Sequence, residues 1–267
     1  MKRIIIPAIA FLLLALLFAY GLLLYPQDSR LPSGNSLESP SARHWLGTDN
    51  LGIDIFAQIS NGFFHSLSIG LSTAMIAFLL GGALGVAAGY AGGRVDMLVE
   101  FLINLFLSVP QLPIMIVIGA FFGQSSFNII CIIAAFSWAP IAKQVRARTM
   151  SLRRTRYLIL ARSYGGGLWY LFRTHMSRDI MPLLAISSIA VTGRAIVQES
   201  SLAFLGLSDP LAKSWGLMIA RCTAFKGIYF TEFWKWWLLP PVFSLVISVL
   251  LLRLFTRALE SYWLEKE

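Results

Sequence analysis

Six apolar runs divide this chain, and they restrict its fold more than any other feature. A helix needs about 20 predominantly apolar residues to cross a bilayer. The predicted spans are residues 4–25, 63–91, 97–122, 127–142, 180–205 and 236–258. Only 13% of the residues are charged, about half the fraction found in a soluble domain. The chain is therefore predicted to be an all-α, polytopic transmembrane helical protein with six spans.

Lys and Arg are distributed unevenly among the segments between these spans. The segment 143–178 carries nine positive charges and no Asp or Glu, whereas the whole chain has a net charge of +9. Basic residues gather on the cytoplasmic side of membrane proteins. With 143–178 inside, 14 of the 22 Lys and Arg residues fall on the inner side, among them Lys2, Arg3 and Lys266, and 6 on the outer side. Both termini are therefore predicted to be cytoplasmic, and the basic balance needs no nucleic-acid partner.

The centre of the basic segment predicts a short helix. Residues 159–167 read ILARSYGGG, a helix-like run that stops on glycines. Glycine permits the sharp turn that commonly ends a helix. The candidates for contact with another protein are Ile159, Leu160, Ala161, Arg162, Ser163, Tyr164, Gly165, Gly166 and Gly167. The alternative is a loop that only satisfies the charge rule and has no protein partner.

Polar residues recur along the third predicted span. Their spacings of four, four and three residues place them on one helix face. They are Glu100, Asn104, Ser108 and Gln111. Polar groups inside a membrane turn toward other helices or toward a water-filled path, so this face predicts either interhelical hydrogen bonds or a pathway wall. Pro110 and Pro113 are expected to kink the helix.

Two charged residues lie inside the fifth predicted span. Arg194 and Glu199 are five positions apart in the sequence. That separation is about 140° around a helix, so they are poorly placed to pair with each other. A charge at this depth costs at least about 2.5 kcal/mol on insertion scales. Each side chain is therefore expected to find a partner on another helix and to have a structural or functional role.

Glycines in the second predicted span indicate a close helix contact. Gly81, Gly85 and Gly89 recur every four residues, and small residues on one face let two helix backbones approach in a membrane. The polar segment 26–62 before this span is expected outside the membrane. Within it, residues 45–54 predict an ordered loop with Asx-type hydrogen bonds.

The sequence offers no recognisable chemistry for catalysis. It has no GxxxxGK(S/T) phosphate loop and no GxSxG nucleophile motif. Its three histidines and two cysteines are scattered among different settings, which predicts neither a metal site nor a disulfide framework. We therefore expect no enzyme activity, no catalytic residue and no cofactor in this chain.

Four segments resemble those of one protein family. Residues 44–49 read HWLGTD, residues 89–96 read GYAGGRVD, residues 199–207 read ESSLAFLGL with SWG at 214–216, and residues 237–241 read WLLPP. In this order they are similar to the membrane-spanning permease subunits of ABC importers for peptides and nickel, and most closely to the second of the two permeases in such systems. The resemblance runs from about residue 44 to the C-terminus.

The resemblance implies a fold, a set of partners and a location. The fold would be that of type I ABC importer permeases, with residues 1–62 as an N-terminal helix and external loop, residues 63–267 as the permease domain, and residues 143–178 as its coupling loop. The partners would be a homologous second permease, two ABC ATPases, an extracytoplasmic solute-binding protein and the bilayer of a bacterial inner membrane. ATP and Mg²⁺ would be bound by the ATPases. The implied solutes are peptides and chelates of nickel or another metal.

The coupling loop of this family carries a short helix that docks into a cleft on the ATPase, and residues 159–167 fall in its place. Ala161, Arg162 and Gly165 match the family pattern, whereas Ile159 occupies the position of the family's glutamate. The resemblance implies that ATP binding moves the docked helices. That motion would switch the path between outward and inward access.

Two other functions are consistent with the residues alone. A stand-alone secondary transporter or channel would use Arg194 and Glu199 as coupling-ion or gating residues, and it predicts solute flux without an ATPase. A membrane scaffold would use the basic segment 143–178 to recruit acidic proteins or lipids, and it predicts no flux in any reconstitution.

Overall fold

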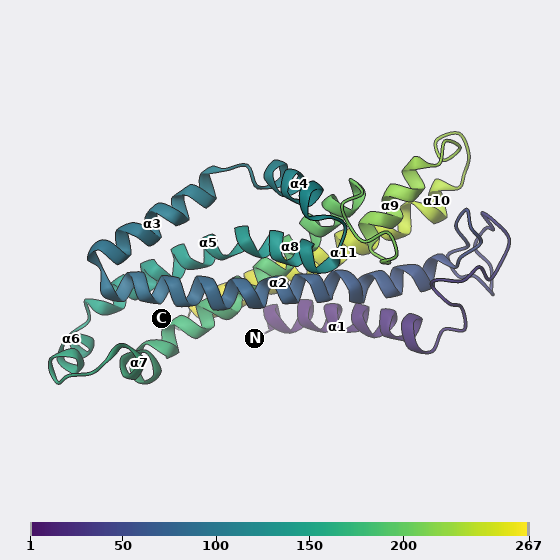
Figure 1. Ribbon diagram of the computed structural model, residues 1–267. Coiled ribbons are helices and arrows are strands. Elements are labelled where there is room, and N and C mark those ends of the chain that lie inside the picture. The colour runs from purple at the N-terminus through teal and green to yellow at the C-terminus, as the bar shows by residue number, and fades with distance from the viewer. Residues whose placement is uncertain (1, 266–267) are drawn as a thin grey trace.

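The computed structural model describes residues 2–265 as a bundle of helices (Figure 1). The elements are α1 Lys2–Leu23, α2 Ile55–Ala91, α3 Gly93–Ser108, α4 Gln111–Phe122, α5 Ser126–Arg153, α6 Arg156–Ser163, α7 Leu168–Leu171, the π-helix η1 Phe172–Met176, α8 Ser177–Phe204, α9 Trp215–Ala224, α10 Trp234–Trp237 and α11 Leu239–Leu264. The all-α prediction is confirmed. Lys266 and the side chains of Lys2 and Arg3, which entered the charge count, lie outside the described part of the chain.

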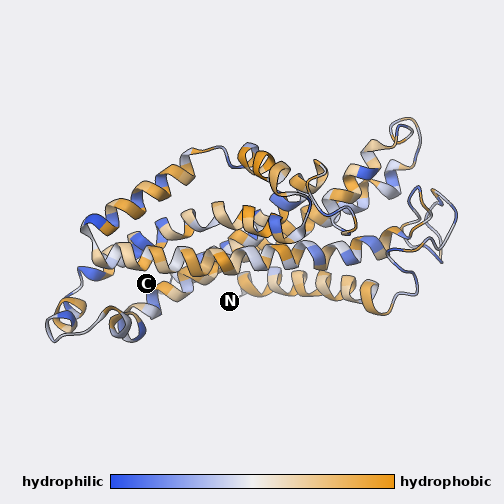
Figure 2. Ribbon diagram, viewed as in Figure 1, coloured by the Kyte–Doolittle hydropathy of each residue, from blue (hydrophilic) through white to orange (hydrophobic). Residues whose placement is uncertain are grey.

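Within residues 2–265, five helical segments are long and apolar enough to cross a membrane. They are Ile4–Leu23, Ile55–Ala91, Ser126–Arg153, Leu168–Phe204 and Trp234–Trp263. The sixth candidate is the pair α3 and α4, which passes the same test only when its two halves are taken together. Figure 2 shows that the long helices are mostly apolar, with hydrophilic residues gathered toward the α6–α7 end and in the loop at the opposite end. The described residues therefore contain five span candidates, or six, as predicted, if the bent pair counts as one span.

The third predicted span is not one continuous helix. α3 ends at Ser108, α4 begins at Gln111, and the two halves are bent by 89°. Val109 has φ −88° and ψ 135°, an extended conformation. A following proline disfavours the helical conformation of the preceding residue, so Pro110 breaks the helix where only a kink was expected.

α2 begins eight residues before the span predicted from hydropathy, at Ile55. Asp54 caps it, because its carboxylate accepts a 2.9 Å hydrogen bond from the backbone N–H of Ala57. The first two turns are buried, including Ile55 and Ile59. Packing rather than lipid contact therefore accounts for this early part of α2, which hydropathy alone assigned to the loop.

α5 is also longer than predicted, and it runs through Pro140 to Arg153. Proline is tolerated in membrane helices because neighbouring groups satisfy the backbone carbonyl that it frees. Beyond it, Val145, Thr149 and Leu152 recur at helical spacing and are buried. The predicted end of the fourth span at residue 142 is therefore wrong, since the basic segment starts inside a packed helix.

The glycines of α2 provide the close contact that their spacing predicted. A Cβ atom at Gly81, Gly85 or Gly89 would lie 2.7–2.8 Å from the carbonyl oxygens of Trp138, Ala142 and Arg146 of α5, respectively. Cβ atoms essentially never approach an oxygen this closely, so only glycine permits this separation. The contact residues recur at every fourth position in both helices. α2 and α5 are consequently held side by side over two turns.

The loop between α1 and α2 is organised by buried polar groups. His44 Nδ1 lies 2.9 Å from Asp54 Oδ2, and the Tyr25 hydroxyl donates to the same oxygen at 3.1 Å. Burial raises the pKa of Tyr25 to about 12, and the charge of Asp54 acts in the same direction. The loop is therefore a structured cap on the end of the bundle opposite α6 and α7 (Figure 1).

The Asx-type hydrogen bonds predicted for this loop are present. The Asp49 carboxylate accepts from the backbone N–H of Leu51 at 2.8 Å and from that of Ile53 at 3.0 Å. Its second oxygen accepts from Gln58 at 2.8 Å. These bonds tie the turn to the first part of α2.

Candidate functional site

α6 forms at the centre of the basic segment and ends in a glycine turn. Gly165 has φ +86°. Its N–H donates to the carbonyl of Arg162 at 3.0 Å, and the N–H of Gly166 donates to the carbonyl of Ala161 at 3.1 Å. This pair of bonds is the Schellman motif, which satisfies the last carbonyls of a helix. The short helix predicted in this segment is present, and it begins three residues before Ile159.

One face of α6 is fixed to the bundle. Leu158 is 4% exposed and belongs to an apolar cluster that includes Leu152 of α5, Leu171 of α7 and Ile180 of α8. Ala161, nearly one turn further on, packs against the same cluster. α6 is thereby attached to the ends of both α5 and α8. A displacement of α6 would be transmitted to those two membrane helices.

The other face of α6 is apolar and exposed. Ile159, Leu160 and Tyr164 are 53%, 58% and 90% exposed, and Trp169 and Tyr170 of the adjoining α7 segment are 74% and 56% exposed. We refer to these five residues as the α6–α7 patch. Large exposed apolar side chains gathered at one end of the bundle are candidates for contact with a protein or a membrane.

The charges near α6 connect it and its neighbours to the bundle. The Arg162 guanidinium lies 5.4 Å from the ring centroid of Tyr90, at the end of α2, which is cation–π geometry. Arg148 pairs with Asp179 at 2.8 Å and so joins α5 to α8. Because segment 143–178 contains no acidic residue, such carboxylates come from outside it.

The polar residues predicted on one face of the third span are divided by the helix break. Glu100 and Asp96 of α3 both pair with Arg146 of α5, the former at 3.0 Å. Asn104 and Ser108 are exposed on α3. The structure therefore gives Glu100 an interhelical contact and leaves the other two on an uncovered surface.

Gln111 lies beyond the break, at the start of α4. It accepts a 3.2 Å hydrogen bond from Gln198 of α8. This contact holds α4, the second helix of the bent pair, against α8. The four predicted residues thus serve at least two separate contacts rather than one continuous wall.

Glu199 and Arg194 of α8 have different surroundings. The Glu199 side chain is fully buried, and it accepts hydrogen bonds from Ser66 of α2 at 3.0 Å and from Ser200 at 3.3 Å. Arg194 is exposed, and within residues 2–265 it has no ion pair or hydrogen bond. The expectation of a partner on another helix holds for Glu199 and fails for Arg194.

Several functional candidates were missed by the sequence analysis. Gln198 contacts Gln111 across 87 positions of sequence, a pairing that no local spacing predicts. Arg253 and Arg257 of α11 line the same groove as Arg194. Their only sequence signal was a positive charge in or near the last apolar run.

The described residues contain no cluster suited to a metal ion. No group of three or more His, Cys, Asp or Glu side chains comes together anywhere in the part of the chain that the structure covers. The polar groups described above instead join helices or line surfaces.

Comparison with known proteins identifies a family. The binding-protein-dependent transport system inner membrane component family matches residues 81–263. A Brucella suis protein with the provisional name of peptide permease is 32% identical over 229 residues, which cover 84% of this chain and 73% of the relative. The nickel transport system permease protein of Escherichia coli is 32% identical over 263 residues, covering 97% of this chain and 92% of the relative. The dipeptide transport system permease protein of Alkalihalophilus pseudofirmus is 30% identical over 217 residues, covering 81% and 70%.

These matches agree with the helical bundle and with the segments that carried the resemblance. They favour an importer subunit over a stand-alone carrier or a scaffold, because the relatives are components of transport systems. The family consists of transport subunits, not enzymes. The chain therefore belongs to the binding-protein-dependent transport system inner membrane components, as a permease subunit of an ABC importer.

Proposed function

We propose that residues 159–167 couple this permease to a cytoplasmic ATPase. The observation that carries the proposal is the division of α6 into two faces. Leu158 anchors one face in the bundle, while Ile159, Leu160 and Tyr164 project from the other. A short helix held in this way can enter a cleft on a partner and still transmit force to the helices behind it.

In this proposal the ATPases supply the free energy and this chain supplies the path and the lever. ATP and Mg²⁺ bind to two ATPase partners, whose closure draws the docked α6 helices of the two permeases together. The attachment of α6 to α5 and α8 through Leu152 and Ile180 carries that motion into the membrane. The path then changes between outward and inward access.

The proposed orientation places α6 and α7 in the cytoplasm. That end of the bundle is basic, as the charge rule requires of the inner side. Figure 1 shows the loop after α1 at the opposite end, and α11 runs toward the end that holds α6 and α7. On the basis of this charge distribution, we propose that both termini lie on the cytoplasmic side of a bacterial inner membrane.

The partners proposed for the complete importer are a homologous second permease, two ATPases and an extracytoplasmic solute-binding protein. The proposed solutes are peptides or metal chelates, because relatives that cover most of this chain are named for dipeptides and for nickel. Residues 63–267 would form the permease domain and 1–62 an N-terminal addition. α2 runs across that division, so the two parts share a helix.

The polar residues that join helices are proposed to brace the helices that move; of the three, Glu199 is buried, Gln111 is partly buried and Glu100 is exposed. Glu199 joins α8 to α2, Glu100 joins α3 to α5, and Gln111 joins α4 to α8. For the buried Ser66–Glu199 pair, removing one partner leaves an unsatisfied group, which costs about 1–3 kcal/mol. These contacts therefore favour movement of whole helices over local rearrangement.

Gly165→Val tests the proposal through the turn that ends α6. A β-branched residue is strongly disfavoured at φ +86°, so the Schellman turn and the position of Tyr164 are expected to change. We expect the assembled importer to hydrolyse ATP with at least a tenfold loss of solute uptake per ATP. Uptake and hydrolysis are measured in the same proteoliposomes.

Gly123→Val is the matched control. Gly123 has φ +82°, and a Cβ atom at either glycine meets nothing within 4 Å. The control places valine at a similar positive φ in the turn between α4 and α5, far from α6 (Figure 1). If Gly165→Val retains normal coupling, or if both variants lose coupling equally, α6 is not the lever.

A further inference from the structure

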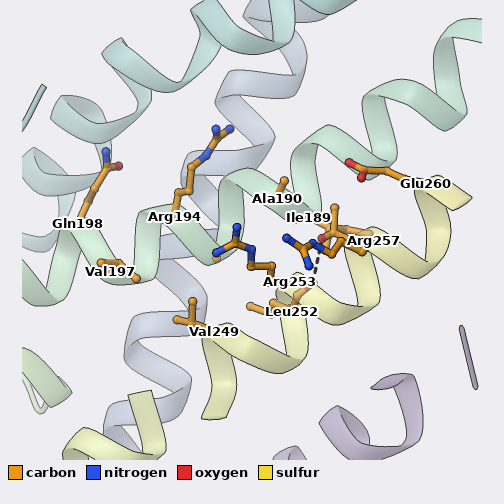
Figure 3. Close-up of a pocket in the computed structure, with 12 residues that line it drawn as sticks. Ile189, Ala190, Arg194, Val197, Gln198, Val249, Leu252, Arg253, Arg257 and Glu260 are labelled. Atoms are coloured by element: carbon orange, nitrogen blue, oxygen red, sulfur yellow. Dashed lines mark hydrogen bonds between the residues drawn. The ribbon is translucent and has the colours of Figure 1, made fainter. Parts of the chain in front are cut away.

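A groove of about 570 Å³ lies between α8 and α11, and it is lined by three arginines. Arg194 comes from α8, and Arg253 and Arg257 come from successive turns of α11. Figure 3 shows Arg253 and Arg257 lying between the two helices, while Arg194 extends from α8. Gln198 and Glu260 complete the polar part of the lining.

The three guanidinium groups have no counter-ion within the described part of the chain. No ion pair or hydrogen bond joins any of them to another side chain there. Glu260 is the one acidic residue in the lining, so the groove has a formal charge of +2. Guanidinium groups are strong donors to carboxylate and phosphate.

Arg194 lies deep in its helix, whereas Arg253 and Arg257 lie progressively nearer the inner end of α11. Arg194 is 15 positions from Asp179 and 10 positions from Phe204, the last residue of α8, which is about 22 Å and about 15 Å along a helix. Arg253 is 14 positions from Leu239, where α11 begins, and 11 positions from Leu264, where it ends, which is about 21 Å and about 16 Å. Charged side chains at such depth face protein or a water-filled cavity rather than lipid tails.

We infer that this groove is a section of the translocation path that binds an anionic group of the passing solute, such as a carboxylate. The inference rests on the proposed function, in which the path lies between this chain and a second permease. The apolar remainder of the lining, including Val197, Val249 and Leu252, accommodates the uncharged part of such a solute.

The placement of the arginines suits transfer rather than permanent binding. They occupy different levels of the groove, Arg253 and Arg257 being one helical turn apart. Transport requires binding that is favourable enough to admit a solute and weak enough, or spread over enough sites, to release it. Several arginines without fixed counter-ions meet that requirement for an anion.

The test uses the assembled importer and needs no knowledge of its solute. In a background with Cys131→Ser and Cys222→Ala, a cysteine is placed in the groove by Val197→Cys. Its reaction rate is measured with an anionic and with a cationic methanethiosulfonate of similar size, each relative to a free thiol. We expect the anionic reagent to react about tenfold faster than the cationic one, because of the net positive charge nearby.

Substitution of the arginines separates charge from shape. Arg253→Gln combined with Arg257→Gln should reduce the preference to less than about threefold, whereas Arg253→Lys with Arg257→Lys should retain it. Complex formation and ATP hydrolysis, measured on the same preparations, show that each variant has folded. They also report on the coupling proposal separately from this one.

Three results would overturn the inference. Reaction of both reagents at equal relative rates would show that the groove is wet but does not select anions. Failure of both to react in the intact complex would show that the second permease or lipid covers this face. A preference that disappears in nanodiscs of anionic lipid but not in zwitterionic ones would assign the arginines to lipid headgroups.

Discussion

Leu158 and Leu160 allow the two faces of α6 to be tested with the same chemical change. Leu158 is 4% exposed and lies in the apolar cluster, whereas Leu160 is 58% exposed. Leu158→Ala removes part of the anchor, and Leu160→Ala removes part of the surface proposed to dock. The two variants should therefore fail in different assays.

The cost of Leu158→Ala follows from its burial. Buried Leu→Ala substitutions cost about 2–5 kcal/mol, depending on how far the site collapses. α6 lies at the edge of the bundle and can partly collapse, so about 3 kcal/mol is expected. Since 1.4 kcal/mol is tenfold in an equilibrium constant, the opening of α6 should become about 100-fold more frequent. Leu160→Ala creates no buried cavity, because Leu160 is exposed. It should change the frequency of α6 opening by less than about threefold.

Amide hydrogen exchange on the purified permease measures the opening of α6 directly. Protection of residues 156–163 should fall strongly in Leu158→Ala and remain unchanged in Leu160→Ala. Binding of the ATPases should show a different pattern. Leu160→Ala should weaken their association although its free α6 is intact, because a contact residue has been removed.

Two outcomes would refute this division of roles. Equal loss of protection in both variants would show that α6 has no distinct anchored face. Unchanged ATPase association in Leu160→Ala, together with normal coupling, would show that the exposed face of α6 is not the docking surface.

Three other perturbations test the surrounding structure. Gly85→Leu should separate α2 from α5, because its Cβ would lie 2.8 Å from the Ala142 carbonyl oxygen. The melting temperature of the permease should therefore fall. It should stay unchanged in the control Gly193→Ala, where the nearest atom to the added Cβ is 3.7 Å away. Asp54→Ala removes a helix cap and should destabilise the outer loop by at least about 1 kcal/mol, measured by proteolysis of the loop. Tyr25 has a pKa raised to about 12 by burial. The stabilisation of the outer loop by neutral Tyr25 is complete below pH 10 and is lost as the pH rises toward 12. In Tyr25→Phe the stability of the loop should therefore depend less on pH in that range.

The overall class and much of the organisation were predictable because they depend on local patterns. Apolar runs of spanning length predicted the helical bundle, and the four-residue period of Gly81, Gly85 and Gly89 predicted a close helix contact. The glycines after Ser163 predicted where α6 ends. In each case one stretch of sequence contains the whole physical cause.

The errors arose where tertiary packing determines the structure. Hydropathy ended the fourth span at residue 142, although Val145 and Thr149 extend the packed face of α5. Hydropathy also began the second span at residue 63, because Gln58 and Ser60 interrupt the apolar residues of the first turns of α2, which are nevertheless buried. Pro110 was recognised, but the size of its bend depends on what α4 contacts.

The pathway candidates depended even more on long-range contacts. Arg194 and Glu199 looked alike in the sequence, yet one lines a groove and the other is buried between α2 and α8. Arg253 shares the groove with Arg194 at a distance of 59 positions along the chain. Only the packing of α8 against α11 brings them together.

The most direct test of the coupling proposal is the accessibility of position 164 before and after the ATPases bind. Tyr164 and Phe230 are both 90% exposed, and they lie at opposite ends of the bundle. In the background without native cysteines, Tyr164→Cys and Phe230→Cys are reacted with a maleimide, alone and in the assembled importer. The account predicts that the ATPases protect position 164 at least tenfold and leave position 230 unchanged, and that a cysteine in the ATPase cleft can be cross-linked to position 164. Equal labelling of position 164 in the permease and in the intact complex, without cross-linking, would contradict it.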